Sequence, residues 1–133
     1  MKNILTEIVA HKHIEVAARK AQRSVEELEQ TSWFKRVPLS LAQFLQDPAK
    51  TGIIAEFKRR SPSKGVINGD VTVHDVTMAY TRYGASGLSV LTDEQFFGGS
   101  SDDLQQARTA NPNIPILVRT LSSMNTRYWK QRR

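Results

Sequence analysis

Strand-type and helix-type segments alternate over residues 52–117, at a spacing of roughly 30 residues, as in βαβ units. Apolar strand-type runs fall at residues 52–58, 87–91 and 114–117, and helix-type segments follow the first two runs. Strand, helix, strand, helix, strand in this order is typical of right-handed parallel βαβ units. The alternation therefore predicts an α/β fold with a parallel sheet.

The predicted units fit a (β/α)8 TIM barrel, in which functional side chains sit at the carboxyl ends of the strands. The chain has 133 residues, whereas a complete barrel needs about 250. Two βα units and a third strand cannot close a barrel. We therefore expect an amino-terminal fragment, with residues 52–117 forming the first part of the barrel.

Residues 1–51 are predicted to form a helical extension before the first strand. Residues 3–21 have the apolar periodicity of an amphipathic helix. Ser24 with Glu27 forms a capping box that opens a short second helix, and Ser40 with Gln43 repeats the device before a third.

Two opposite charges stand on the first predicted strand. Residues i and i+2 of a strand point to the same face, so Glu56 and Lys58 share one face and Phe57 takes the other. Charges on an otherwise buried strand are costly unless they are paired. This pattern favours the catalytic end of an enzyme strand, and the alternative is a surface ion pair on an exposed strand.

Several longer stretches carry a resemblance to a known family. They are Ile-Ile-Ala-Glu-Phe-Lys-Arg-Arg-Ser-Pro-Ser-Lys-Gly at 53–65, the helical residues 4–12 and 15–20, and the strand and loop residues 83–93 and 96–100. Together they resemble indole-3-glycerol-phosphate synthase, over residues 4–117.

The resemblance implies ring closure of 1-(2-carboxyphenylamino)-1-deoxyribulose 5-phosphate, a phosphorylated small molecule, with loss of carbon dioxide and water. It implies that Glu56 handles protons or orients the substrate and that Lys58 holds the anionic substrate. Ser61 would contact anionic groups, and Phe97 would line the pocket of the anthranilate ring. No metal or organic cofactor is implied.

The third strand departs from the family pattern, which would continue Leu-Arg-Lys-Asp-Phe-Ile-Ile-Asp-Glu-Tyr. The family's general-acid lysine follows this strand, where the chain has Val118 and Arg119. Codons permitted for residues 118–133, read with one added base, give Arg-Lys-Asp-Phe-Ile-Ile-Asp-Glu-Tyr-Gln. We therefore expect residues 118–133 to be an out-of-frame, non-native tail and the chain alone to be inactive; a genuine basic tail is the alternative.

The net charge of +6 invites a nucleic-acid interpretation, but residues 118–133 hold five positive charges and no acid, which leaves +1 for the rest. A basic face along the fold is therefore not predicted, nor is nucleic-acid binding. The chain has no cysteine and no run of ~20 apolar residues, so we expect a cytoplasmic protein without membrane contact. Protein partners are not indicated. A tail-driven binding module and an unstable fragment with open strand edges stay open as alternatives.

Two short motifs have weaker functional interpretations. Ser61-Pro62 resembles a phosphorylation site, but its place after a strand favours an ordered turn. Gly98-Gly99-Ser100 could bind phosphate, but the acids that follow it would repel an anion, which favours a mobile loop between strand and helix.

Overall fold

The computed structural model describes residues 3–32 and 34–120. The described residues divide into two compact units, one within residues 3–38 and the other of residues 39–120. Most of the predicted out-of-frame tail, residues 121–133, lies outside the described residues.

The first unit contains α1 (Ile4–Gln22) and α2 (Val25–Glu29). The side chain of Asn3 caps α1 by accepting a hydrogen bond from a backbone amide of its first turn. At α2 the predicted capping box is present, because the Ser24 hydroxyl and the Glu27 carboxylate each accept from the other residue's backbone amide, at 3.2 and 2.8 Å. Both helices thus start where the sequence predicts.

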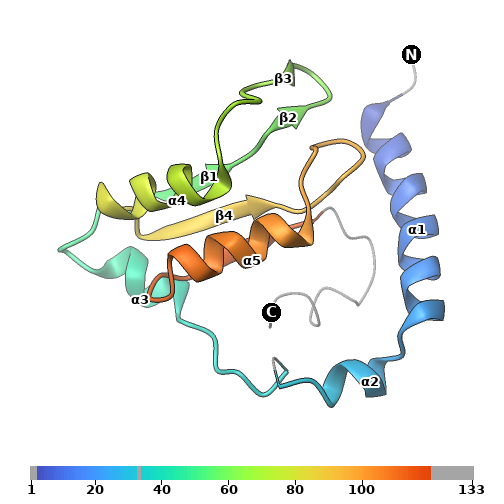
Figure 1. Cartoon of the computed structure of the whole chain (residues 1–133), viewed down its shortest axis with the longest axis horizontal. Coiled ribbons are helices and arrows are strands. Elements are labelled where there is room, and N and C mark those ends of the chain that lie inside the picture. Colours follow the sequence, from blue (N-terminus) through green and yellow to red (C-terminus); the bar gives the residue numbers. More distant parts are fainter. Residues whose placement is uncertain (1–2, 33, 121–133) are drawn as a thin grey trace. The chain divides into compact units, whose positions relative to one another are not determined.

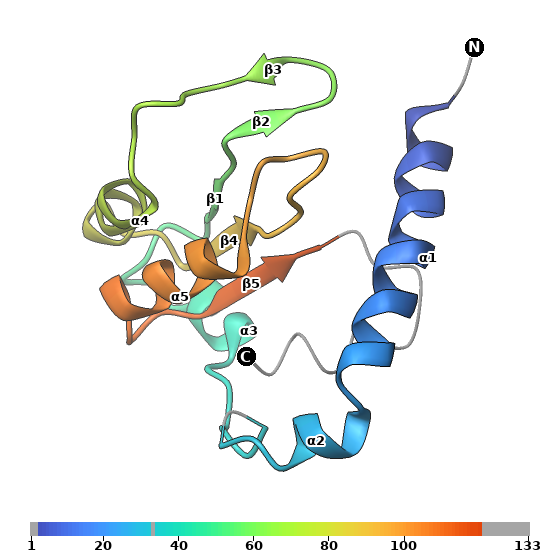
Figure 2. The same ribbon diagram turned by 45° about the vertical axis from the view of Figure 1, so that its right-hand side comes forward.

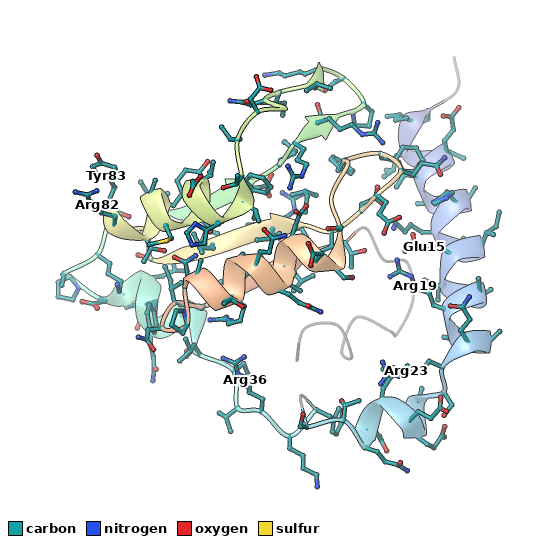
Figure 3. The ribbon with its side chains drawn as sticks, viewed as in Figure 1. Glu15, Arg19, Arg23, Arg36, Arg82 and Tyr83 are labelled. Carbon is teal, nitrogen blue, oxygen red and sulfur yellow. The ribbon has the colours of Figure 1, made fainter. Side chains whose placement is uncertain are left out.

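One acidic side chain on α1 lies between two basic ones. Glu15 pairs with Lys12 on the turn before it and with Arg19 on the turn after it. Figure 3 shows Glu15 and Arg19 one above the other along α1. Pairs at this spacing stabilise a helix by a few tenths of a kcal/mol each, about 0.2–0.5.

The second unit is built on a three-stranded parallel sheet. Its strands are β1 (Ile54–Phe57), β4 (Gly87–Leu91) and β5 (Ile116–Arg119), in the order β1-β4-β5. The crossover helices α4 (Val73–Arg82) and α5 (Ser101–Ala110) pack side by side on one face of this sheet (Figure 1). The predicted parallel βαβ order is therefore confirmed.

Two smaller elements lie at opposite ends of the strands. The short helix α3 (Leu41–Gln46) packs near the amino end of β4, where a Cβ on Gly87 would come within 2.5 Å of the Leu41 side chain. The hairpin of β2 (Arg60–Ser61) and β3 (Gly65–Val66) extends beyond the carboxyl end of β1 (Figure 2). The hairpin therefore marks the carboxyl edge of the parallel sheet, where functional side chains of such folds lie.

The apolar core lies between the sheet and the two crossover helices. Phe57 and Val90, neighbours in the β1–β4 register, pack with Val73 of α4 and Ala107 of α5. Since side chains alternate along a strand, residues next to Phe57 and Val90 must point to the opposite face of the sheet. That opposite face carries Glu56.

Three details differ from the predictions. Ile54 is 38% exposed, because it points, like Glu56, to the face of the sheet opposite α4 and α5, and its partner on β4 is a glycine. Tyr83 has the helical spacing of a residue on the apolar face of α4, but it is 81% exposed, and Thr77 is buried instead. Arg82 and Tyr83 project from the end of α4, away from the sheet (Figure 3). The third strand begins at Ile116, two residues later than expected, and continues to Arg119.

None of the described helices is long and apolar enough to cross a membrane.

Candidate functional site

The carboxylate of Glu56 is the centre of a polar cluster on the face of the sheet opposite the helices. Its Oε2 accepts a hydrogen bond from the Ser89 hydroxyl at 3.1 Å and pairs with Nη1 of Arg119 at 2.7 Å. Its Oε1 lies 3.6 Å from Nζ of Lys58. The structure thus brings together the two predicted residues Glu56 and Lys58 and adds two more.

The strand register explains why these four side chains meet. Glu56 of β1 is paired with Ser89 of β4, and Arg119 of β5 is paired with Leu91, two residues farther along β4. All three strands are parallel, so their carboxyl ends lie at one edge of the sheet. Lys58 follows the end of β1 directly. Residues distant in sequence therefore converge at the edge where parallel α/β folds bind ligands.

The cluster holds more positive than negative charge, because one carboxylate faces both Lys58 and Arg119. The pairs are partly accessible to water: the Glu56 side chain is 24% exposed and that of Arg119 is 53% exposed. Pairs this exposed contribute about 0–1 kcal/mol to stability. An anion could replace the carboxylate as partner of either cation at small cost.

A second ion pair joins the end of β1 to the helix layer. Nη2 and Nε of Arg59 donate to the two carboxylate oxygens of Asp103, at 2.6 and 3.2 Å. The hydrogen bond to Asp103 raises the pKa of Arg59 above its ordinary value, against a smaller opposing effect of burial. The Arg59 guanidinium also lies 5.1 Å from the centre of the Phe57 ring. Arg59 thereby fixes the strand end just before the hairpin.

Ser61 lies in β2, half-buried, next to the turn of the hairpin, where it is paired with Gly65. Its hydroxyl accepts from the backbone amide of Lys64 at 3.2 Å and lies 3.4 Å from the Ser63 hydroxyl. These contacts close an ordered turn at Pro62, as the sequence predicts. The described hydrogen bonds of Ser61 stay within the hairpin, so the structure does not join it to the Glu56 cluster.

Phe97 lies half-buried in the loop that connects β4 to α5. Asp93 closes this loop: its Oδ1 accepts from the amide of Phe96 at 2.8 Å and its carbonyl accepts from Gly99, also at 2.8 Å. The loop that the sequence predicts between strand and helix is thus held by hydrogen bonds as a turn of residues 93–99. It lies beside the hairpin of Ser61 in both ribbon views (Figures 1 and 2).

Sequence reasoning missed Ser89, the Arg59–Asp103 pair and the place of Arg119. Ser89 gave a signal, because it is a hydroxyl in the middle of an otherwise apolar strand. Arg119 was assigned to a non-native tail and left out of the site. Arg59 and Asp103 are 44 residues apart, and no local pattern relates them. In the described part of the chain, no group of three or more histidine or acidic side chains is placed to hold a metal.

The model of the family "Indole-3-glycerol phosphate synthase" matches residues 5–120. The chain belongs to the indole-3-glycerol phosphate synthase family. This family has the TIM barrel fold, of which the described residues form an open part with a parallel sheet.

Curated relatives agree in name and extent. The chain is 45% identical over 120 residues to the indole-3-glycerol phosphate synthase of Bacteroides thetaiotaomicron, covering 88% of this chain and 44% of the relative. It is 43% identical over 121 residues to that of Prochlorococcus marinus strain MIT 9515, covering 89% of this chain and 40% of the relative. It is 41% identical over 120 residues to the synthase of Bordetella pertussis, covering 88% of this chain and 45% of the relative. The chain thus spans less than half the length of these relatives of the synthase family.

Proposed function

We propose that this chain carries the first-strand part of an indole-3-glycerol phosphate synthase site. The reaction would be closure of the indole ring, with decarboxylation and dehydration of 1-(2-carboxyphenylamino)-1-deoxyribulose 5-phosphate. One observation carries the proposal: Glu56, Lys58 and Arg119 meet at the carboxyl edge of a parallel sheet. Two cations around one partly exposed carboxylate suit a substrate that bears a carboxylate and a phosphate.

The named side chains have distinct proposed roles. Lys58 holds the anionic substrate as a charge partner, and Glu56 accepts or orients a proton of the reacting groups. Ser61 contacts an anionic group from the hairpin, and Phe97 packs against the aromatic ring of the substrate. Ser89 keeps the Glu56 carboxylate in place through its 3.1 Å hydrogen bond.

We further propose that the chain alone binds without catalysing. The cation at the end of β5 is Arg119, and a guanidinium does not release its proton near neutral pH. The general-acid lysine that the resemblance implies is therefore lacking at this strand. Groups that later barrel strands would supply are also needed. A non-catalytic or basic-tailed binding module derived from the enzyme is the competing proposal.

The test is a pair of measurements on the purified chain. Titration with the substrate, followed by amide chemical shifts, should show saturable binding that weakens in Lys58→Met. The matched control is Arg82→Gln, which removes an exposed cation at the end of α4, before the amino end of β4 and away from the cluster (Figure 3). A parallel assay should detect no indole-3-glycerol phosphate.

The outcomes separate the proposals. Equal weakening in Lys58→Met and Arg82→Gln would mean that only the general positive charge attracts the ligand. Turnover by the chain alone would refute the proposed inactivity. Binding of nucleic acid with a steep dependence on salt would favour the binding module.

A further inference from the structure

Arg60 joins two loops that carry candidate substrate residues. Its Nη2 donates to the backbone carbonyl oxygens of Glu94 and Gln95, at 3.0 and 2.5 Å. Arg60 itself belongs to β2, next to Ser61, whereas the two carbonyls belong to the turn of residues 93–99, which carries Phe97. One side chain thus spans the gap between the β2–β3 hairpin and the turn of residues 93–99.

The stem of Arg60 also lies against the turn. A Cβ placed on Gly98 would come within 3.1–3.3 Å of Nε, Cδ and Cγ of Arg60. Gly98 has φ +63°, a conformation that glycine adopts at little cost. The missing side chain therefore leaves room for Arg60 to lie along the turn while its end group reaches the carbonyls.

The turn holds its own shape through three backbone amides. Those of Phe96, Gly98 and Gly99 donate to the Asp93 carboxylate, the Glu94 carbonyl and the Asp93 carbonyl. None of these bonds ties the turn to the hairpin. Two side-chain hydrogen bonds from the hairpin to the turn come from Arg60.

We propose that Arg60 is a positioning residue that fixes the turn of residues 93–99 against the hairpin. It sets the spacing between Phe97, on the turn, and Ser61, on the hairpin. This inference rests on the proposed function, because it concerns two residues assigned there to the substrate. A guanidinium suits the role because it remains charged at all working pH values and one of its nitrogens can donate to both carbonyl oxygens.

The experiment compares Arg60→Gln, Arg60→Lys and the control Arg82→Gln in the full chain. Hydrogen exchange by NMR reports on the amides of Phe96, Gly98 and Gly99, and the sheet amides report on global stability. We expect Arg60→Gln to speed exchange in the turn about fivefold, the equivalent of about one net hydrogen bond, and to leave the sheet unchanged. Arg60→Lys should restore most of the protection, because one nitrogen serves both carbonyls. Arg82→Gln should change neither.

Substrate titration of the same variants tests the link to binding. Arg60→Gln should weaken substrate affinity about fivefold, with partial recovery in Arg60→Lys. Unchanged exchange in the turn, or an equal rise in turn and sheet, overturns the proposal. Faster exchange in the turn with unchanged affinity overturns the positioning role.

The two proposals can fail separately. A wild-type chain that does not bind substrate refutes the proposed function and, with it, the link from Arg60 to the substrate. The exchange results would still decide whether Arg60 fixes the turn.

Discussion

Replacing Arg59 with glutamine should destabilise the chain by about 3 kcal/mol. The substitution removes two charge-assisted hydrogen bonds to Asp103, at 2.6 and 3.2 Å, each worth about 1.5–3 kcal/mol. The Asp103 side chain is 6% exposed, so it would stay buried without its cation, but the Arg59 side chain is 32% exposed and recovers solvation when unpaired. The loss should therefore lie at the low end of the ~3–5 kcal/mol known for broken buried pairs.

Urea unfolding followed by far-ultraviolet circular dichroism measures this loss. The matched control is Arg119→Gln, because Arg119 also contacts a carboxylate at 2.7 Å but is 53% exposed. We expect the control to lose less than about 1 kcal/mol. Equal losses in the two variants would refute the reasoning that burial, and not distance, sets the contribution of an ion pair.

The pH dependence of the Arg59–Asp103 pair follows from the direction in which the pKa of Arg59 is shifted. The pKa of Arg59 is raised in the folded chain, first by its hydrogen bond to Asp103. A raised pKa gives stability that is present below the unfolded pKa and is lost only as pH rises through the folded one. Both values lie far in the alkaline range, so the loss in Arg59→Gln should be the same at pH 6 and pH 8.

Three further substitutions test other parts of the structure. Gly99→Ala should cost about 2 kcal/mol or more in urea unfolding, because its Cβ would lie 1.9 Å from the Leu91 carbonyl oxygen. Asn111→Ala should cost about 2–4 kcal/mol, because this buried amide bonds two threonine hydroxyls of α4 and a backbone carbonyl of α5; a smaller loss would mean that water replaces it. The pKa of Asp75 is lowered, first by the His74 ring and then by the capping threonine, so its NMR titration midpoint should lie below the usual range and rise in His74→Ala. The stability from Asp75 is therefore present above the unfolded pKa and is lost as pH falls through the lower folded one.

The sequence predicted the fold where the signal was local. Capping residues marked the starts of two helices: Ser24 for α2 and Ser40 for α3 each accept from a backbone amide of the first turn. Strand β4 has the bounds of the apolar run predicted at residues 87–91, and all five of its residues are buried. Caps and apolar runs depend on neighbours within a few residues, and so they can be read from one chain.

Features that depend on the tertiary structure were predicted less well. Tyr83 has the spacing of a buried helix residue but lies beyond the last turn of α4, where the backbone leaves the helical conformation. Ile54 has the character of a buried strand residue, but its exposure depends on what covers the face of the sheet opposite α4 and α5. Arg59 and Asp103 meet only after a whole βαβ unit has formed. None of these outcomes is encoded within a short window of sequence.

The candidate site also combines residues that a local sequence pattern relates with residues that only the tertiary structure brings together. Glu56 and Lys58 could be paired from the sequence, because their spacing of two places them on one face of a strand. Ser89 and Arg119 join them only through the parallel register of β4 and β5. That register gives the cluster a surplus of positive charge around a carboxylate that stays accessible to water, whereas the Arg59–Asp103 pair on the helix side is balanced and its carboxylate is buried. A balanced pair with a buried carboxylate stabilises the fold, but an unbalanced and accessible cluster adds little stability and attracts anions. The contrast between the two faces of one short strand is the physical reason to place ligand binding at Glu56 and structural support at Arg59.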